Sequence, residues 1–496
     1  MIIDESEEPS SSVKSPTEVS STAFNQTEAG VGPLQQLLPP PYVSYQAVLP
    51  PVVTSPPRRQ KQRWARLHKT RRRLAFASIA LNCLFFLLLL RITRRERTTE
   101  RMGRDKHGDT DITIPPILPV IPVAKPDPRS GKCVASATWS NATFISPDDD
   151  SPFNTTSHAS FTFPDASSAM FLIAQGAQLG GHLQVVATSP HALPRVDIQA
   201  RYCSARVLDR SAVCQMEQKK TGSVGLGIFT PHAFDGQSAT DALDFTITLF
   251  LPTSSDPGSN SAVYNLETNL PQFSQSFDAL RDVVRFDQLK IEGRGKPIHA
   301  KSVFANNATV MNANAKISGS FETSSSLILS TTNAPVLSSI KLHHRNIFKT
   351  THLRIETCNA EIDAPISLFT TAANGQGGRF NISATTTNAP MTMTFPSAPA
   401  RSILHLDAET KNSPASVWLN EAFEGDFTLF SNVVLVDQLP YVDIRKLRTV
   451  DWQSDLKRLG FVKGEVRWKM PILGGAKKPL GSVRISTNNS FLKLHV

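Results

Sequence analysis

A six-residue pattern, Thr-x-Asn-Ala/Ser-Pro/Glu-apolar, recurs along the C-terminal part of this 496-residue chain. Its clear copies place asparagines 26, 29 and 24 residues apart, a weaker copy precedes them, and a last copy closes the chain. The asparagines are Asn314, Asn333, Asn359, Asn388, Asn412 and Asn489. A period in the twenties is typical of stacked units, none of which can bury its apolar face alone. The chain is therefore expected to fold by stacking such units.

Each unit is predicted to be a strand, a tight Asn-centred turn and a second strand. Asn tolerates a left-handed backbone and bonds its own main chain, which suits a corner. The Thr favours a strand end, and the Pro lacks the N–H that a central ladder position needs. Lys316 and Glu361 replace this Pro in two copies. The interval from Asn412 to Asn489 is too long for one unit, so residues 440–480 are expected to be an insertion or a different packing layer.

From Cys133 onwards, helical periods almost vanish and short alternating runs favour an all-β domain. The runs are Ser160–Phe163, Met170–Ile173, His182–Ala187, Val196–Ala200 and Leu243–Leu251. Gly180–Gly181 and Pro252 are expected to mark turns. The predicted fold is all-β, a β-sandwich or β-solenoid-like repeat ectodomain, with one subdomain at 133–287 and a repeat subdomain at 288–496.

The repeated turns resemble those of β-repeat domains grouped as "putative adhesins". The whole layout resembles fungal single-pass membrane proteins of unknown function that carry such a domain behind a Pro-rich tail. The resemblance covers roughly residues 133–496, and the turns of 312–492 carry it. It implies a fold and no catalytic residue.

An uncharged segment, Leu74–Leu90, lies between two basic clusters. Residues 58–73 hold nine basic and no acidic residues, and residues 91–106 hold seven basic and three acidic ones. The net charge of +10 therefore marks membrane flanks and does not indicate nucleic-acid binding. A helix of this length spans roughly 25 Å, enough for a short bilayer crossing. We expect a disordered cytosolic tail (1–73), an uncleaved signal-anchor (74–92) and a basic, then Pro-rich stalk (93–132).

The distribution of sequons and cysteines favours an extracytoplasmic C-terminal domain at the plasma membrane or in the secretory pathway. The sequons beyond the membrane segment are at Asn141, Asn154, Asn307, Asn381 and Asn488. Four cysteines also follow it, an even number that suits an oxidising compartment. Cys203 and Cys214 are close enough to be bridged across a hairpin, which leaves Cys133 with Cys358. The alternative is that all four are buried thiols that form no disulfide.

No catalytic, metal or cofactor constellation stands out. His343 and His344 are adjacent, so in a strand they point to opposite faces and do not form a metal pair. The leading hypothesis is a type II surface glycoprotein whose non-enzymatic ectodomain binds a wall glycan, a neighbouring cell or a partner protein. The alternative is a membrane-tethered carbohydrate-active enzyme using Asp407 and Glu409, which share one strand face.

The tail carries two short motifs. Pro39, Pro40, Pro41 and Tyr42 form a Pro-Pro-x-Tyr ligand for a WW domain, in which the prolines pre-form polyproline II. Tyr45 and Val48 fit a Tyr-x-x-apolar sorting signal. Chance occurrence in a Pro-rich tail is the alternative in both cases.

Overall fold

The computed structural model describes residues 131–144, 153–163, 169–218, 221–231, 243–253, 263–346, 348–438, 448–454, 460–468 and 481–496. The predicted tail, its WW and sorting motifs, the membrane segment and most of the stalk lie outside these residues. Within them, no helix is long and apolar enough to cross a membrane, and the single helix is the five-residue α2 (Ala205–Asp209). Strands dominate the described residues, so the all-β prediction is confirmed.

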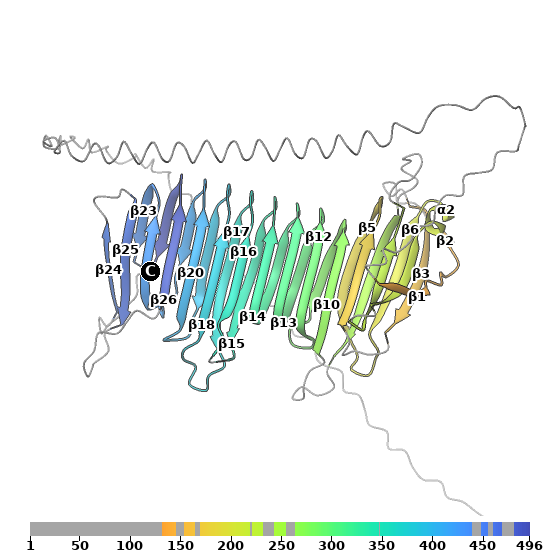
Figure 1. Cartoon of the computed structure of the whole chain (residues 1–496), viewed down its shortest axis with the longest axis horizontal. Coiled ribbons are helices and arrows are strands. Elements are labelled where there is room, and N and C mark those ends of the chain that lie inside the picture. Colours follow the sequence, from red (N-terminus) through yellow and green to blue (C-terminus); the bar gives the residue numbers. More distant parts are fainter. Residues whose placement is uncertain are drawn as a thin grey trace, which may run out of the picture. The chain divides into compact units, whose positions relative to one another are not determined.

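The chain passes repeatedly between two sheet faces that enclose one core (Figure 1). One pass consists of a strand on the first face, a corner, a strand on the second face and a return corner. We call this unit a coil, and we call the corner that leads from the first face to the second the Asn corner. Neighbouring coils pair in parallel, whereas the N-terminal end of the stack also contains antiparallel pairs on both faces. The long bent strands β13 (Ile298–Ala313) and β14 (Ile317–Thr331) contribute to both faces.

The first face contains, in spatial order, β1 (Lys132–Ser136), β7 (Ala212–Gln218), β8 (Ser223–Phe229), β4 (Ala169–Gln175), β10 (Val263–Pro271), β12 (Arg285–Arg294), the second half of β13 (Ile298–Ala313), the second half of β14 (Ile317–Thr331), β16 (Thr351–Glu356), β18 (Arg379–Thr385), β20 (Ile403–Thr410), β26 (Gly481–Thr487), β22 (Gly425–Phe430), β25 (Phe461–Trp468) and β24 (Arg448–Ser454).

The second face contains β2 (Thr143–Phe144), β3 (Thr155–Thr162), β6 (Arg195–Tyr202), β9 (Leu243–Pro252), β5 (Leu179–Thr188), β11 (Phe273–Ala279), the first halves of β13 and β14, β15 (Val336–His344), β17 (Ile362–Thr370), β19 (Met391–Ser397), β21 (Ala415–Trp418), β27 (Phe491–His495) and β23 (Val433–Asp437).

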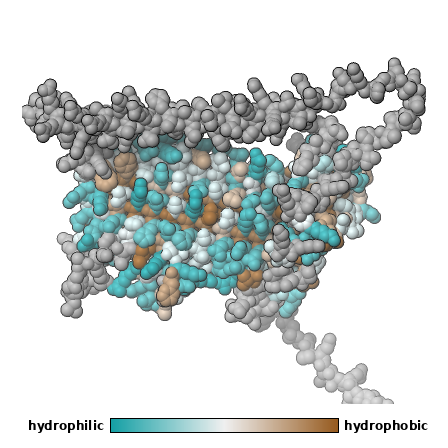
Figure 2. All heavy atoms as spheres, viewed as in Figure 1, coloured by the Kyte–Doolittle hydropathy of each residue, from teal (hydrophilic) through white to brown (hydrophobic). Residues whose placement is uncertain are grey.

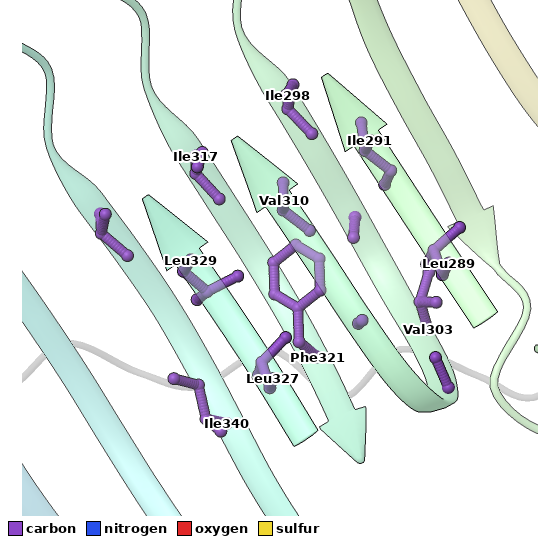
Figure 3. Close-up of a cluster of buried hydrophobic side chains, with 14 of the residues drawn as sticks. Leu289, Ile291, Ile298, Val303, Val310, Ile317, Phe321, Leu327, Leu329 and Ile340 are labelled. Carbon is purple, nitrogen blue, oxygen red and sulfur yellow. The ribbon is translucent and has the colours of Figure 1, made fainter. Parts of the chain in front are cut away.

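Alternating side chains of each strand fill the space between the faces. In the section shown in Figure 3, Val310, Ile317, Phe321 and Leu329 come from β13 and β14 and lie in this core; each is at most 2% exposed. Burying a side chain of this kind contributes about 1.5 to 3 kcal/mol, a gain that requires a neighbouring coil on each side. The outward positions are mainly polar, and in Figure 2 the visible surface is largely hydrophilic with an apolar band running along the stack.

Spatial order departs from chain order at both ends of the stack. Near the N-terminus, the coil of β4 and β5 lies between the coil of β8 and β9 and the coil of β10 and β11. The last coil, β26 and β27, lies between the coil of β20 and β21 and the coil of β22 and β23. The long interval between Asn412 and Asn489 therefore contains one further coil, placed outside the last one. It also contains the antiparallel strands β24 and β25, which extend the first face within the expected 440–480 region.

Two details differ from the sequence expectations. Gly180–Gly181 lie inside β5 and do not form a turn, because the adjacent strand approaches closely: a Cβ at Gly181 would lie 2.0 Å from the Phe245 carbonyl oxygen. The expected boundary at 287/288 falls within β12, which pairs with β10 on one side and β13 on the other. Strand pairing thus continues through that position.

Candidate functional site

The six repeat asparagines lie at equivalent Asn corners and form one hydrogen-bonded ladder. From Asn333 onwards, each Nδ2 donates to the Oδ1 of the asparagine in the neighbouring coil on the Asn314 side. The bonds are Asn333 to Asn314 (2.6 Å), and Asn359 to Asn333, Asn388 to Asn359, Asn412 to Asn388 and Asn489 to Asn412 (2.7 Å each). The ladder follows spatial order, because Asn489 bonds Asn412 across the coil that intervenes in the chain.

The expected left-handed backbone is found in this ladder only at Asn314, whose φ is +67°. The other five asparagines are absent from the described non-glycine residues with positive φ. Asparagine is therefore selected at these corners mainly because its amide both donates to one neighbouring coil and accepts from the other. A residue that adopted the left-handed backbone but lacked a side-chain amide would not form hydrogen bonds to both neighbouring coils.

The Thr and Pro of the pattern also bond between coils. The Thr386 hydroxyl is buried and donates to the Ala360 carbonyl at 3.3 Å, so a polar group at a strand end is satisfied. At the Pro position only the carbonyl is used: Ile362 N–H donates to the Pro390 oxygen at 3.1 Å, and Val336 N–H donates to the Glu361 oxygen at 3.0 Å. Glu can therefore replace Pro without loss of a ladder bond. These bonds show that the corner stabilises the stack.

A groove of about 620 Å³ lies on the outer surface of the second face, near its N-terminal end. Trp139 and its neighbours form one wall, and His158, Ser160, Asp197, Gln199, Thr246 and Thr248 supply polar lining from β3, β6 and β9. Ser140 fixes the wall: its N–H donates to the His158 carbonyl at 2.8 Å, and its Oγ accepts from His158 N–H at 3.0 Å. Sequence reasoning missed this groove, because Trp139 is joined to β9 only by the fold.

The groove combines an aromatic surface with hydroxyl, amide and carboxylate groups, which suits a ligand with apolar ring faces and many hydroxyls. The Ser160 hydroxyl donates to Asp197 Oδ1 at 2.7 Å, and Arg195 lies 3.1 Å from the other Asp197 oxygen. Ser160 is therefore oriented by a carboxylate and is not paired with His158 as a nucleophile with its base.

The five sequon asparagines, Asn141, Asn154, Asn307, Asn381 and Asn488, are all exposed. Asn307 and Asn381 project from β13 and β18 on the first face, and Asn488 lies directly beside the ladder. None of the five is among the residues that line the groove. Glycans at these positions would therefore leave the lining residues unmodified.

The expected disulfide pairing is wrong. Cys133 of β1 is bonded to Cys214 of β7, with Cα atoms 5.8 Å apart. Cys203 and Cys214 are not in one hairpin, because β6, which ends just before Cys203, belongs to the second face and β7 belongs to the first. Cys358 is exposed at an Asn corner, and its expected partner Cys133 is already bonded.

The carboxylates considered for an enzyme lie elsewhere. Asp407 and Glu409 do share the outer side of β20, where both are exposed, and Asp407 is in register with Arg484 of β26. His343 and His344 point to opposite sides of β15 as expected: His343 contacts Glu322, and buried His344 packs edge-on against Phe380. Among the described residues, no group of three or more His, Cys, Asp or Glu side chains is arranged to hold a metal ion.

No family model and no curated protein matches this chain. Two solved structures are similar to it. A putative cell adhesion protein from Clostridium sporogenes is 8% identical, with 68% of this chain and 99% of that one covered and a TM-score of 0.15. A putative adhesin from Parabacteroides merdae is 10% identical, with 54% and 96% covered and a TM-score of 0.28. TM-scores this low carry no functional argument, so function has to come from this chain's own residues.

Proposed function

We propose that the protein is a single-pass, type II surface or secretory-pathway glycoprotein whose β-solenoid ectodomain binds a glycan without transforming it. The groove at Trp139 carries the proposal, because it places an indole beside side chains that can bond sugar hydroxyls. A wall polysaccharide is the ligand that the resemblance to fungal membrane proteins favours. The basic clusters around Leu74–Leu90 and the five sequons support the proposed topology.

Binding of neutral wall oligosaccharides to the full-length chain in detergent micelles tests the proposal. Trp139→Ala should weaken binding at least about tenfold, the loss expected for an aromatic contact with its buried area. Thr246→Val, which removes one hydroxyl from the lining, should weaken it less. Trp452→Ala is the matched control, because Trp452 is exposed on β24 at the far end of the stack.

Equal binding by the Trp139 and Trp452 variants would reject the groove as the site, and absence of binding to every wall fraction would reject the function. Turnover of a wall polymer that disappears in Asp407→Asn or Glu409→Gln would establish the carbohydrate-active enzyme instead.

The topology and the tail are further parts of the proposal. Glycosidase treatment should lower the mass of the cell-derived chain, and protease added outside intact cells should remove the C-terminal domain. Tyr42→Ala should abolish capture of a WW domain by a peptide of residues 30–55 and slow internalisation. Retained capture would leave the tail as a spacer.

A further inference from the structure

A second cleft, of about 260 Å³, lies at the return corner, on the opposite side of the coils from the Asn ladder. Arg281, Asp282, Arg285, Phe304, Glu322, His343 and Arg345 line it, and the exposed carboxylate of Asp282 lies 3.7 Å from Arg281 Nε. They come from the turn before β12, from the bends of β13 and β14, and from the end of β15. Stacking alone brings these separate segments together.

The negative charge of Glu322 is already balanced by neighbouring basic side chains within the cleft. Its side chain is 1% exposed, and its carboxylate lies 2.9 Å from Arg281 Nε, 2.9 Å from Lys341 Nζ and 3.0 Å from His343 Nε2. Burial raises the pKa of Glu322, whereas hydrogen bonds from His343 and Lys341 lower it. With the charges of Lys341 and Arg281 added, the pKa falls to about 2. This carboxylate stays ionised and is fully used by its own three partners.

Two further cations have no such partner. The guanidinium carbons of Arg285 and Arg345 lie 5.3 and 4.8 Å from the ring centroid of Phe304. Within the described residues neither forms an ion pair. Each is close enough to repel the other: partial burial and the charge of Arg285 both lower the pKa of Arg345. Holding two like charges beside one ring costs free energy that an anion between them would offset.

We propose that this cleft binds the carboxylate of an acidic sugar residue between Arg285 and Arg345. The planar guanidinium groups match a carboxylate, which can accept two parallel hydrogen bonds from one of them and a further hydrogen bond from the other. The cleft is larger than a bare carboxylate and just below the usual range for drug-sized ligands, so it suits one monosaccharide. Phe304 is buried beneath both guanidinium groups and so positions the two arginines side by side in the cleft.

The site is separate from the groove at Trp139, and the two tests can fail independently. The probe is hexaglucuronate, with hexaglucose and inorganic sulfate as comparison ligands, measured by calorimetry on the full-length chain in detergent. Arg285→Gln and Arg345→Gln should each weaken hexaglucuronate binding about tenfold or more, the loss of one charge-assisted contact. Arg484→Gln, which removes the same charge from exposed β26, should leave binding within about twofold.

Thermal stability separates a binding role from a structural one. Because Arg285 and Arg345 repel each other, Arg345→Gln should keep or raise the melting temperature while it loses the ligand. Loss of binding that is accompanied by a lower melting temperature in both variants would overturn the proposal. Equal loss in Arg484→Gln, binding of inorganic sulfate alone, or no binding of hexaglucuronate would overturn it as well.

Discussion

The Asn ladder makes a quantitative prediction for Asn388→Ala. Asn388 donates one side-chain hydrogen bond to Asn359 and accepts one from Asn412, so the substitution removes both. The backbone bond from Asn388 N–H to the Cys358 carbonyl remains. Each net hydrogen bond contributes about 0.5 to 1.5 kcal/mol, and these side chains are exposed, so the expected loss in unfolding free energy is about 1 to 2 kcal/mol. In a cooperative unit of this size, that lowers the melting temperature by about 2 °C.

The geometry of the ladder sharpens the test. Asn489 ends the described ladder and makes one such bond, so Asn489→Ala should cost about half as much as Asn388→Ala. Asn359→Ala also removes two bonds, but one of them is shared with Asn388. The double variant Asn359→Ala/Asn388→Ala loses three bonds where two singles lose four. Its cost should therefore fall below the sum of the singles by about one hydrogen bond, roughly 0.5 to 1.5 kcal/mol.

Urea unfolding of the full-length chain in detergent, followed by circular dichroism, measures these differences as midpoint shifts at constant slope. Thr332→Ala is the matched control, because Thr332 is exposed at the equivalent corner of Asn333 and its backbone carbonyl, which the substitution keeps, bonds the next coil. If Asn388→Ala cost no more than Thr332→Ala, or if the double variant were simply additive, the ladder would not stabilise the stack.

Three further predictions concern other parts of the fold. The free energy of unfolding should fall by about 4 kcal/mol in the Cys133→Ser/Cys214→Ser variant, because the disulfide closes a sequence separation of 81 residues. Cys358→Ser should leave the free energy of unfolding unchanged. A disulfide-linked Cys203–Cys214 peptide in a non-reducing digest would contradict the pairing. Gly319→Ala should abolish stable folding, because a Cβ would lie 1.8 Å from the Ala300 carbonyl oxygen. Gly375 also has positive φ but lies in open space, so Gly375→Ala should lower the free energy of unfolding by only about 1 kcal/mol, measured by thermal unfolding. In the folded protein the pKa of Glu322 is about 2, below its ordinary value of 4.5. The ionised carboxylate therefore stabilises the fold above pH 4.5, and this stabilisation is lost as the pH falls toward 2. Glu322→Gln should therefore cost about 3 kcal/mol at pH 7 and little near pH 2, and a cost that persists at pH 2 would show that charge is not the cause.

The coils from Asn314 to Asn412 are predictable from sequence because the same side-chain hydrogen bond is formed at each corner. An amide that must bond both neighbouring coils has to recur at every coil, and the recurrence is visible without a structure. The position of the last coil is not predictable in this way. β20 pairs in parallel with β26, which lies far from it in the chain. The local sequence of β22 does not show that β22 should pair with the outer side of β26 instead of directly with β20.

The N-terminal coils use a different solution at the same corner. Gln178, Gln272 and Gly295 lie at their Asn-corner positions and have φ of +52°, +65° and +82°. Left-handed residues thus turn the chain where no asparagine repeats, and Asn314 combines both features at the junction. A corner that requires only a left-handed backbone can be formed by several residue types, so these corners produce no repeated pattern in the sequence.

The same logic explains why the cleft at the return corner could not be predicted from the sequence. The Asn corner repeats a short turn, whereas the return corners vary from the bend within β14 to the loops 371–378 and 398–402. A corner that need not repeat can carry unlike residues on successive coils. Phe304, Glu322 and Lys341 are in register on neighbouring strands, yet one is aromatic, one acidic and one basic. In this fold the repeated corner holds the coils together, and the charged and aromatic side chains of the cleft lie where the repetition is broken.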